Sequence, residues 1–302
     1  MSAANPSLEF TGERFTPECV REIWYEHWHR YVFARKLATG KRVLDAACGE
    51  GYGSALLADV ADTVLGADIS DEAVAHARDR YGDRPNLRFE RADATQLDAK
   101  PGSFDLIVSF ETLEHVAAQE ALVAGFAHAL TDDGVLVISS PDKKTYTDDR
   151  GFSNEFHVRE LYRDELLNLL RPHFPHVRLY GQKLLFQSAI WNLDGSPTRA
   201  DVTTSTDEKP SQGLAYEPLY FIAVCSRKPL PDTLADLALF GDREESVYSH
   251  YNSEVRRNMT AGKRIAELED EVAALRATAQ RTSLPAARTS WWRRLFNGNS
   301  AR

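Results

Sequence analysis

The chain has 302 residues, of which 43% are hydrophobic and 27% charged, and its formal net charge is −9 at pH 7. This length allows one large domain with an appendage. An acidic chain is a poor ligand for nucleic acid, so we expect no nucleic-acid partner. The three cysteines, Cys19, Cys48 and Cys225, are too few and too widely spaced for a disulfide framework or a zinc site.

Targeting signals are absent from the places where they are usually found. Residues 1–15 contain no apolar core of a signal peptide. No stretch approaches the ~18 consecutive apolar residues of a spanning helix. We therefore expect a cytoplasmic protein. If it also binds a membrane, we expect it to be peripheral at the inner face, through its C-terminal residues 282–302.

Residues 1–40 are interpreted as an N-terminal lid segment, and residues 41–228 as the main domain. In the main domain, runs rich in Val, Ile and Leu alternate with helical stretches. Such alternation is typical of a parallel sheet with helices on both faces. A helix at 158–174 and two closing strands follow, with a polar loop at 192–213 between those strands. We predict an α/β fold with a doubly wound, mostly parallel seven-stranded sheet. The predicted strands are 42–47, 63–69, 87–93, 104–110, 134–140, 177–186 and 218–227.

The chain changes character after the main domain. Residues 229–262 are interpreted as a linker with short helices. Residues 263–281 carry apolar residues at a and d heptad positions and charges of opposite sign at e and g, which predicts a C-terminal helical coiled-coil extension and a parallel homodimer. Residues 282–302 form a basic, aromatic tail that favours contact with a membrane surface or with a glycosyltransferase. Packing of the heptad helix on its own domain, and disorder of the tail, are the alternatives.

The stretch VLDAACGEGYGS, residues 43–54, combines a strand end with a glycine-rich turn. Such a turn lets the backbone approach a ligand, and both dinucleotide enzymes and methyltransferases use one. Asp45, Asp68 and Asp93 follow three successive strands and should line one crevice at the carboxyl edge of the sheet. Together with Glu50, they would repel a pyrophosphate, whereas S-adenosylmethionine offers an ammonium, a sulfonium and several donors. Helix capping is the alternative role of Asp68 and Asp93.

Residues 42–227 resemble the class I S-adenosylmethionine-dependent methyltransferases. The resemblance rests on the motifs VLDAACGEGYG, GADIS, RADA and FDLIVSFETLEH. Ala47 occupies the position where many members of the family have the first glycine. The resemblance implies S-adenosylmethionine as the cofactor. It implies that Asp45, Gly49 and Gly51 hold the methionine part and that Asp68 takes the ribose hydroxyls. It also implies that Asp93, beside the Ala94 backbone, accepts from the adenine amino group and that Ile69 packs on the adenine. The Phe110 backbone carbonyl would accept from the ammonium. The cofactor residues implied by this resemblance are Asp45, Ala47, Gly49, Gly51, Asp68, Ile69, Asp93, Ala94 and Phe110.

FTGERFTPE (10–18), YEHWHRY (25–31) and NEFHVRE (154–160) narrow the resemblance. They are similar to a subgroup of bacterial methyltransferases found with surface-polysaccharide machinery. This implies O-methylation of a sugar hydroxyl in a bacterial surface glycan, such as O-antigen or capsule, with a sugar or glycan acceptor. The alternatives are a methyltransferase of a small metabolite, such as a natural product or quinone precursor, and a non-catalytic scaffold with this fold.

Methyl transfer to a hydroxyl requires removal of a proton, and histidine suits this at neutral pH. His115, just past the fourth strand, and His157, in the NEFHVRE segment, are the candidate catalytic bases. Packing or orienting roles are the alternatives for both. Glu111, Glu114 and His115 also form a Glu-x-x-Glu-His cluster that resembles the cluster of quinone-pathway O-methyltransferases using a divalent ion. A divalent metal is therefore a second, less favoured cofactor, and helix N-terminal acids are the alternative reading.

Overall fold

The computed structural model describes residues 22–151, 153–190, 193, 201–206, 209–230, 232 and 234–282. The chain divides into two compact units, Met1–Glu244 and Glu245–Arg302. The first unit holds the sheet and its covering helices, and the second holds one long helix. The predicted lid motif FTGERFTPE and the basic, aromatic tail lie outside the described residues.

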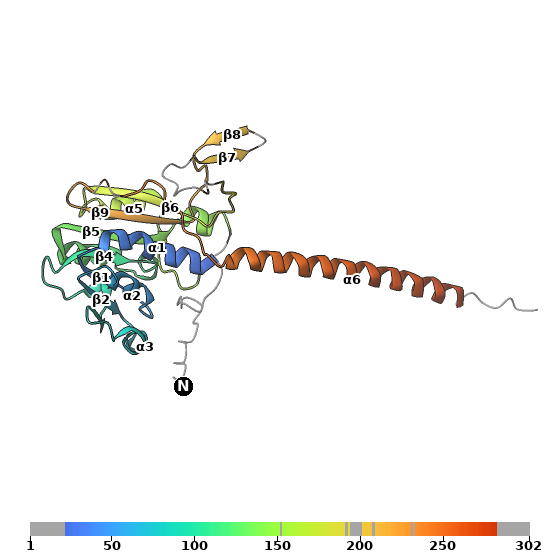
Figure 1. Ribbon diagram of the computed structural model, residues 1–302, viewed down its shortest axis with the longest axis horizontal. Helices are drawn as coiled ribbons and strands as arrows, with labels where there is room; N and C mark the ends of the chain where they lie inside the picture. The colour runs from blue at the N-terminus through green and yellow to red at the C-terminus, as the bar shows by residue number, and fades with distance from the viewer. Residues whose placement is uncertain are drawn as a thin grey trace, which may run out of the picture. The chain divides into compact units, whose positions relative to one another are not determined.

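The first unit is built on a seven-stranded sheet with the order β3-β2-β1-β4-β5-β9-β6 (Figure 1). The strands β1 to β5 pair in parallel, and β9 runs antiparallel between β5 and β6. The predicted doubly wound, mostly parallel sheet is confirmed. The strands are β1 (Arg42–Ala46), β2 (Thr63–Asp68), β3 (Leu87–Arg91), β4 (Phe104–Ser109), β5 (Leu130–Pro141), β6 (His176–Gln182) and β9 (Tyr220–Ser226).

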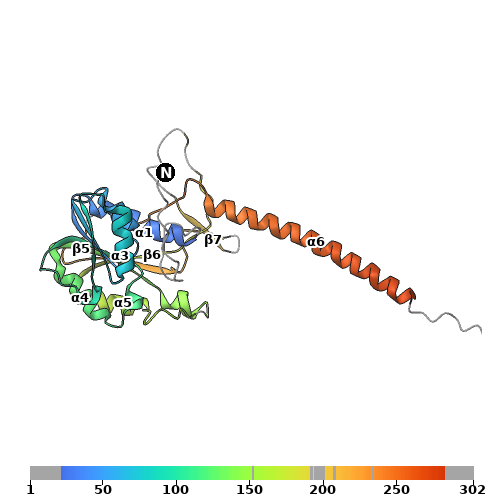
Figure 2. The ribbon, with the colours of Figure 1, turned by 90° about the horizontal axis from the view of Figure 1, so that it is seen from below.

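Helices cover both faces of this sheet, as Figure 2 shows. One hydrophobic cluster joins the sheet to α1, α2 and α3, and a second joins it to α4 and α5. Neighbouring residues of one strand serve opposite clusters: Val43 belongs to the first and Leu44 to the second, as the alternation of side chains along a strand requires. The helices are α1 (Glu22–Ala38), α2 (Tyr52–Ala58), α3 (Asp71–Tyr81), α4 (Gln119–Ala129) and α5 (Arg163–Leu170).

The strand order reverses between β1 and β4, because the chain first winds toward β3 and then returns to the other side of β1. Ligands of open α/β sheets bind at such a switch point, outside the carboxyl ends of the strands. Short helical turns follow there: η1 (Ala94–Gln96) after β3 and η2 (Leu113–His115) after β4, while the π-helical turn η3 (Lys144–Asp148) follows β5. Of the predicted site residues, Ala94 lies on η1, and Glu114 and His115 lie on η2.

The polar segment after β6 contains more regular structure than expected. Strands β7 (Thr203–Thr206) and β8 (Lys209–Gln212) pair antiparallel within the predicted loop 192–213. Hydroxyl groups satisfy the ends of this ribbon: Thr204 Oγ1 donates to the Gly213 carbonyl at 2.6 Å, and Ser211 Oγ donates to the Thr204 carbonyl at 3.0 Å. Threonine favours extended backbone because of its β-branch, which explains a strand in a polar stretch.

The second unit also departs from the expected boundaries. Helix α6 runs without interruption from Ser246 to Thr282, so it begins inside the segment predicted as a linker with short helices. Residues 246–261 contain neither glycine nor proline, and the single Gly262 costs a helix only about 1 kcal/mol. Among the described residues, no helix combines the length and apolar character needed to cross a membrane.

Candidate active site

The glycine-rich turn between β1 and α2 adopts a left-handed backbone at three alternate positions. The φ angles are +62° at Ala47, +55° at Gly49 and +87° at Gly51. A Cβ added at Gly51 would lie 2.7 Å from the Phe89 ring, so this position has no room for a side chain. A Cβ added at Gly49 would meet nothing within 4 Å, so this part of the backbone is open to a ligand. The predicted role of the turn as a ligand cradle fits this geometry.

Asp68 ties the turn to the end of β2. Its Oδ2 accepts from the Gly49 amide at 2.9 Å, and its Oδ1 accepts from the Ser70 amide at 2.9 Å. Helix α3 is instead capped by Ser70, whose hydroxyl accepts from the Ala73 amide at 3.2 Å. The side chain of Asp68 is half-buried, and each oxygen keeps a further lone pair. The predicted ribose contact remains a prediction, and it is compatible with these bonds.

Asp45 lies beneath the turn and is fully buried. Ser54 Oγ donates to its Oδ2 at 2.6 Å, and the Tyr31 hydroxyl lies 3.1 Å from its Oδ1. Burial raises the pKa of this carboxyl to about 7, although the bond from Ser54 opposes the shift. Asp45 therefore joins the turn to helices α1 and α2, and its predicted contact with the methionine part remains a prediction.

The adenine side of the predicted crevice is formed by the ends of β2 and β3. Asp93 accepts from the Thr95 hydroxyl at 2.7 Å and from the Thr95 amide at 2.8 Å, and these bonds lower its pKa. Asp93 thus caps η1, which was the alternative role considered for it. Ile69 is 61% exposed and Ala94 is half-buried, so both present apolar surface where the resemblance expects the adenine.

Glu50 does not lie where the electrostatic argument from the sequence put it. Its side chain is fully buried and lies 3.1 Å from His76 Nε2 and 3.2 Å from Arg80 Nη1. The Tyr81 hydroxyl donates to its other oxygen at 3.3 Å. All three partners belong to α3. Glu50 therefore fastens the turn to α3 and adds little negative charge to the crevice.

The end of β4 carries a strained backbone at Glu111, where φ is +48°. Such strain costs about 1–3 kcal/mol and clusters at functional sites. The Glu111 amide donates to Ser139 Oγ at 3.0 Å, and that hydroxyl donates to Glu111 Oε1 at 2.7 Å. The neighbouring Phe110 carbonyl accepts from Thr112 Oγ1 at 3.0 Å and keeps a second lone pair. Its predicted bond to the cofactor ammonium is thus available and remains a prediction.

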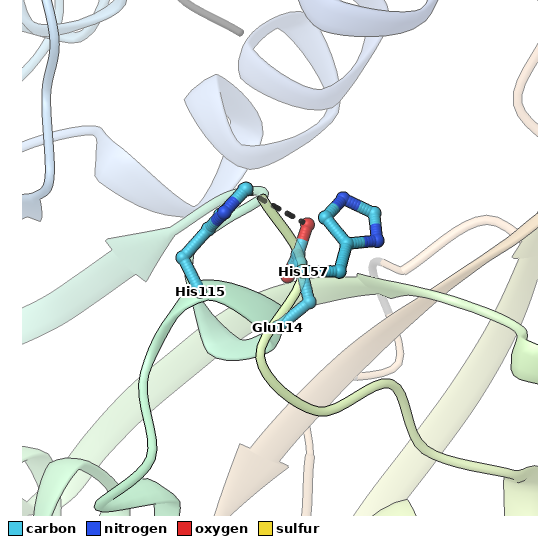
Figure 3. Close-up of side chains that lie close together, drawn as sticks. All are labelled: Glu114, His115 and His157. Carbon is cyan, nitrogen blue, oxygen red and sulfur yellow. Dashed lines mark ion pairs between the residues drawn. The ribbon is translucent and has the colours of Figure 1, made fainter. Parts of the chain in front are cut away.

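The two predicted histidines come together although 42 positions separate them. The His115 and His157 rings pack edge to face with centroids 5.0 Å apart (Figure 3). Glu114, from the same turn as His115, completes the cluster, and its Oε1 lies 3.9 Å from His115 Nε2. The Glu114 carbonyl accepts from the amides of Val158 and Arg159 at 2.8 and 3.0 Å, which fastens the NEFHVRE segment to η2.

Hydrogen bonds define the proton positions of both rings. His115 Nδ1 lies 3.1 Å from the Phe156 carbonyl, an obligate acceptor, so Nδ1 carries the proton and Nε2 the lone pair. His157 Nδ1 lies 2.6 Å from Glu160 Oε1, and both side chains are buried. The Asn154 amide lies 3.0 Å from His157 Nε2, while Asn154 Oδ1 accepts from the Phe156 amide. The lone pair of His157 is therefore engaged, and that of His115 is the better placed to take a proton.

The cluster also satisfies the geometry of a metal site. Glu114, His115 and His157 each offer one ligand atom, and these atoms lie within 4.8 Å of one another. The Phe156 carbonyl and Glu160 orient the second nitrogen of each histidine, as acceptors commonly do around metal-bound histidines. The residue set differs from the predicted one, because Glu111 is held by Ser139 and His157 takes its place. A divalent ion fits these residues and remains a prediction.

Helix α1 supplies a group of site residues that the sequence alone did not identify. Arg30 is only 1% exposed, and its Nη2 lies 3.5 Å from Glu111 Oε1. Glu26, one turn earlier, is also buried, and burial raises its pKa to about 7. His29 stacks on Phe240, and burial lowers its pKa to about 4, so it is no base at this site. The motif YEHWHRY could have indicated this group, because its aromatic residues flank the charged residues Glu26 and Arg30 in the sequence.

Comparisons with known proteins agree with this architecture. A family model described as a methyltransferase domain matches residues 44–138. A protein of Mycobacterium tuberculosis named as a probable S-adenosylmethionine-dependent methyltransferase is 38% identical over 173 residues, which cover 56% of this chain and 62% of that protein. A ubiquinone biosynthesis O-methyltransferase of Thiobacillus denitrificans is 34% identical over 113 residues, which cover 37% of this chain and 49% of that protein.

Among solved structures, the fold is similar to one chain of the complex between the Haloferax volcanii Trm112 methyltransferase activator and a methyltransferase. The TM-score is 0.50 and the identity 19%, with 68% of this chain and 91% of that chain covered. This likeness concerns the fold alone. The match to the family model runs from β1 into β5, and the glycine-rich turn and the Glu111–His115 segment lie within it.

Proposed function

We propose that this chain is a class I S-adenosylmethionine-dependent methyltransferase that methylates a sugar hydroxyl in the synthesis of a bacterial surface glycan. The observation that carries the proposal is the cluster of His115, His157 and Glu114 beside the end of β4. It offers a proton acceptor next to the crevice in which the cofactor residues meet. The NEFHVRE segment, which the resemblance links to glycan machinery, supplies His157, Asn154 and Glu160 to this cluster.

S-adenosylmethionine supplies an electrophilic methyl group on a sulfonium. The acceptor oxygen forms a bond to the methyl carbon as the sulfur–carbon bond breaks, and the electron pair of that bond stays on sulfur. The hydroxyl proton then goes to His115 Nε2, because Nδ1 already carries a proton that it donates to the Phe156 carbonyl. A placed base contributes about 10²–10⁴-fold, and positioning of the reactants contributes much of the remainder. His157, fixed by Glu160, orients the segment that covers His115.

The acceptor class is tested by methyl uptake. Full-length protein is incubated with S-adenosylmethionine labelled on the methyl group and with nucleotide sugars, lipid-linked oligosaccharides or catechol-type metabolites. We expect label on a sugar. Label on a catechol oxygen would favour the second candidate, a small-metabolite O-methyltransferase, which the Glu111–His115 cluster and the similarity to a ubiquinone biosynthesis O-methyltransferase support. Absence of S-adenosylhomocysteine binding by calorimetry would favour the non-catalytic scaffold.

The base is tested by exchanging each histidine for glutamine. We expect His115→Gln to lower kcat by about 10²–10⁴-fold while the affinity for S-adenosylhomocysteine stays within twofold. His157→Gln is expected to lower kcat less. His128→Gln is the matched control, because His128 is exposed on α4. Normal rates for both site variants at saturating acceptor would show that no histidine acts as a base.

A further inference from the structure

Arg30 is a buried cation in a crevice whose predicted ligand contacts are acids. Its Nε donates to Gln182 Oε1 at 2.8 Å, and its guanidinium lies 4.6 Å from the centroid of the Tyr220 ring. Nη1 and Nη2 have no hydrogen-bond acceptor in the described part of the chain, and the contact of Nη2 with Glu111 is a longer ion pair of 3.5 Å. A buried donor without an acceptor destabilises the folded state, so these two nitrogens point to a missing acceptor.

The position of Arg30 indicates which acceptor this is. The next residue, Tyr31, contacts Asp45 under the glycine-rich turn, and its ring packs edge to face on Phe110 with centroids 5.0 Å apart. Glu111, which Arg30 faces, directly follows Phe110. Arg30 therefore lies between the turn and the end of β4, which is where the methionine part of the cofactor is predicted.

The charges of the cofactor complete the argument. S-adenosylmethionine carries a carboxylate besides its ammonium and sulfonium, and Asp45, Asp68 and Asp93 offer nothing that binds a carboxylate. A guanidinium binds a carboxylate through two parallel hydrogen bonds. Resting on the proposed function, we propose that Arg30 binds the carboxylate of the methionine part of S-adenosylmethionine through Nη1 and Nη2. Glu111 then shares the guanidinium and holds it at the edge of the acceptor site.

The test compares two ligands that differ only in this carboxylate: S-adenosylhomocysteine and its decarboxylated analogue. Calorimetry on full-length protein gives the affinity for each. We expect the wild type to prefer S-adenosylhomocysteine by at least tenfold. Arg30→Met should lower that affinity by at least tenfold while the analogue binds within threefold of its wild-type affinity. Arg30→Lys, which keeps the charge, should show an intermediate loss.

The ratio of the two affinities distinguishes a lost carboxylate contact from a general loss of folding, because a partly unfolded variant would bind both ligands more weakly by the same factor. Lys36→Met is the matched control, since Lys36 is exposed on the same helix, and it should change neither affinity. Equal losses for both ligands in Arg30→Met and Arg30→Lys, when both variants show the circular dichroism of the folded wild type, would overturn the inference alone. A phosphate-bearing acceptor is the other oxyanion with suitable chemistry. Unchanged affinity for S-adenosylhomocysteine with a raised KM for a nucleotide sugar would also overturn the inference. A wild type that binds neither ligand would contradict the proposed function as well.

A second inference concerns α6 and rests on different observations. Within its unit, α6 is the only element in the described residues. From Tyr248 onward, its large apolar side chains are exposed. They are Tyr248, Tyr251, Val255, Met259, Ile265, Leu268, Val272 and Leu275.

The last four of these residues are spaced three and four apart, which places them in one stripe along the helix with the spacing of a coiled coil. Ile265 and Val272 occupy a positions, and Leu268 and Leu275 occupy d positions, a combination that favours two parallel strands. In a parallel pair, Arg264 would face Glu269 of the second copy, and Glu271 would face Arg276. Arg264 contacts Glu267 of its own helix at 2.9 Å, but both side chains are largely exposed, and such pairs are weak. We propose that a second copy of this chain covers the stripe as a parallel coiled coil.

Light scattering on the full-length protein tests this inference. We expect a dimer, and we expect the double variant Leu268→Glu/Leu275→Glu to be a monomer with unchanged affinity for S-adenosylhomocysteine. Ala273→Glu places a charge beside the stripe and should remain dimeric. Ala279→Cys should form a disulfide between copies on mild oxidation, because a positions meet in a parallel pair, and the wild type should not. A monomeric wild type at the highest accessible concentration, or a dimer of Ala279→Cys that does not cross-link, would overturn the inference.

Discussion

His157 Nδ1 lies 2.6 Å from Glu160 Oε1, and the two side chains are only 8% and 7% exposed. The carboxylate, three residues further along the same segment, fixes which nitrogen of the imidazole carries the proton. Glu160 also accepts from Thr147 Oγ1 at 2.6 Å, which connects the segment to η3. Glu160 therefore acts as a positioning residue for the histidine cluster.

We predict that Glu160→Leu lowers kcat by about tenfold to a hundredfold, because the buried Nδ1–H of His157 would lose its acceptor at a cost of about 1–3 kcal/mol. Glu160→Gln keeps an acceptor oxygen and should restore most of the rate. Steady-state kinetics with both variants check this, with the KM for S-adenosylmethionine as the internal control. Equal rates for the leucine and glutamine variants would contradict the positioning role.

Asp68 supports the turn and is predicted to bind the ribose. Asp68→Asn should weaken S-adenosylhomocysteine binding by about 1–3 kcal/mol, since an amide loses the charge and must turn a donor toward one of two backbone amides. Titration calorimetry measures this loss. Asp71→Asn, at an exposed position of the same connection, is the control and should bind normally. Normal binding by a folded Asp68→Asn would remove Asp68 from the cofactor site.

Asp45 gives the stability of the protein a specific pH dependence. Burial raises its pKa from 3.8 to about 7 in the folded state. The folded protein therefore keeps a proton that the unfolded chain releases as the pH rises from about 4 to 7, and stability falls across that window. Relative to Asp45→Asn, which cannot ionise, the wild type should lose about 1.4 kcal/mol of unfolding free energy per pH unit there. Urea unfolding at several pH values measures both proteins. Parallel curves would show that Asp45 is ionised in the folded state.

Ala47 has a φ of +62°, in a region where an L-residue costs about 1–2 kcal/mol. Ala47→Gly removes this strain. It also increases the conformational entropy of the unfolded chain, which lowers the free energy of unfolding by about 0.4–1 kcal/mol. We expect a net stabilisation of about 0.5–1 kcal/mol in urea unfolding, with unchanged S-adenosylhomocysteine affinity. A destabilised variant would indicate that the alanine methyl group contributes packing that outweighs the strain.

Much of the fold was predictable because the central strands contain runs of Val, Ile and Leu, such as residues 43–44 in β1, 106–108 in β4 and 135–138 in β5. The glycine-rich turn was equally clear, since positive φ angles favour glycine at alternate positions. The extent of β6 was not, because Leu184 and Leu185 continue the apolar pattern after the strand has ended at Gln182. The start of α6 was missed because polar residues form a helix here without a buried face to reveal its period.

Within the site, residues that follow strand ends were found and residues on α1 were not. Alternating strands and helices indicate a parallel sheet, whose strands end along one carboxyl edge. Asp68 and the Glu111–His115 segment follow strand ends and could therefore be predicted from the sequence. Arg30 and Tyr31 depend on which side of α1 packs against the turn, and apolar and aromatic residues lie all around that helix. The orientation of Glu50 likewise depends on His76 and Arg80 of α3, which only the packed structure brings to it.

The aromatic side chains of α1 have a practical consequence. Trp24 and Trp28 lie 5.6 Å apart, and Trp28 packs on Tyr52, the first residue of α2 after the glycine-rich turn, with centroids 5.5 Å apart. Indole emission responds to small changes in neighbouring groups. Occupation of the turn should thus be visible as a change in intrinsic fluorescence, and the protein would report its own ligand occupancy without a label, on the timescale of a stopped-flow experiment.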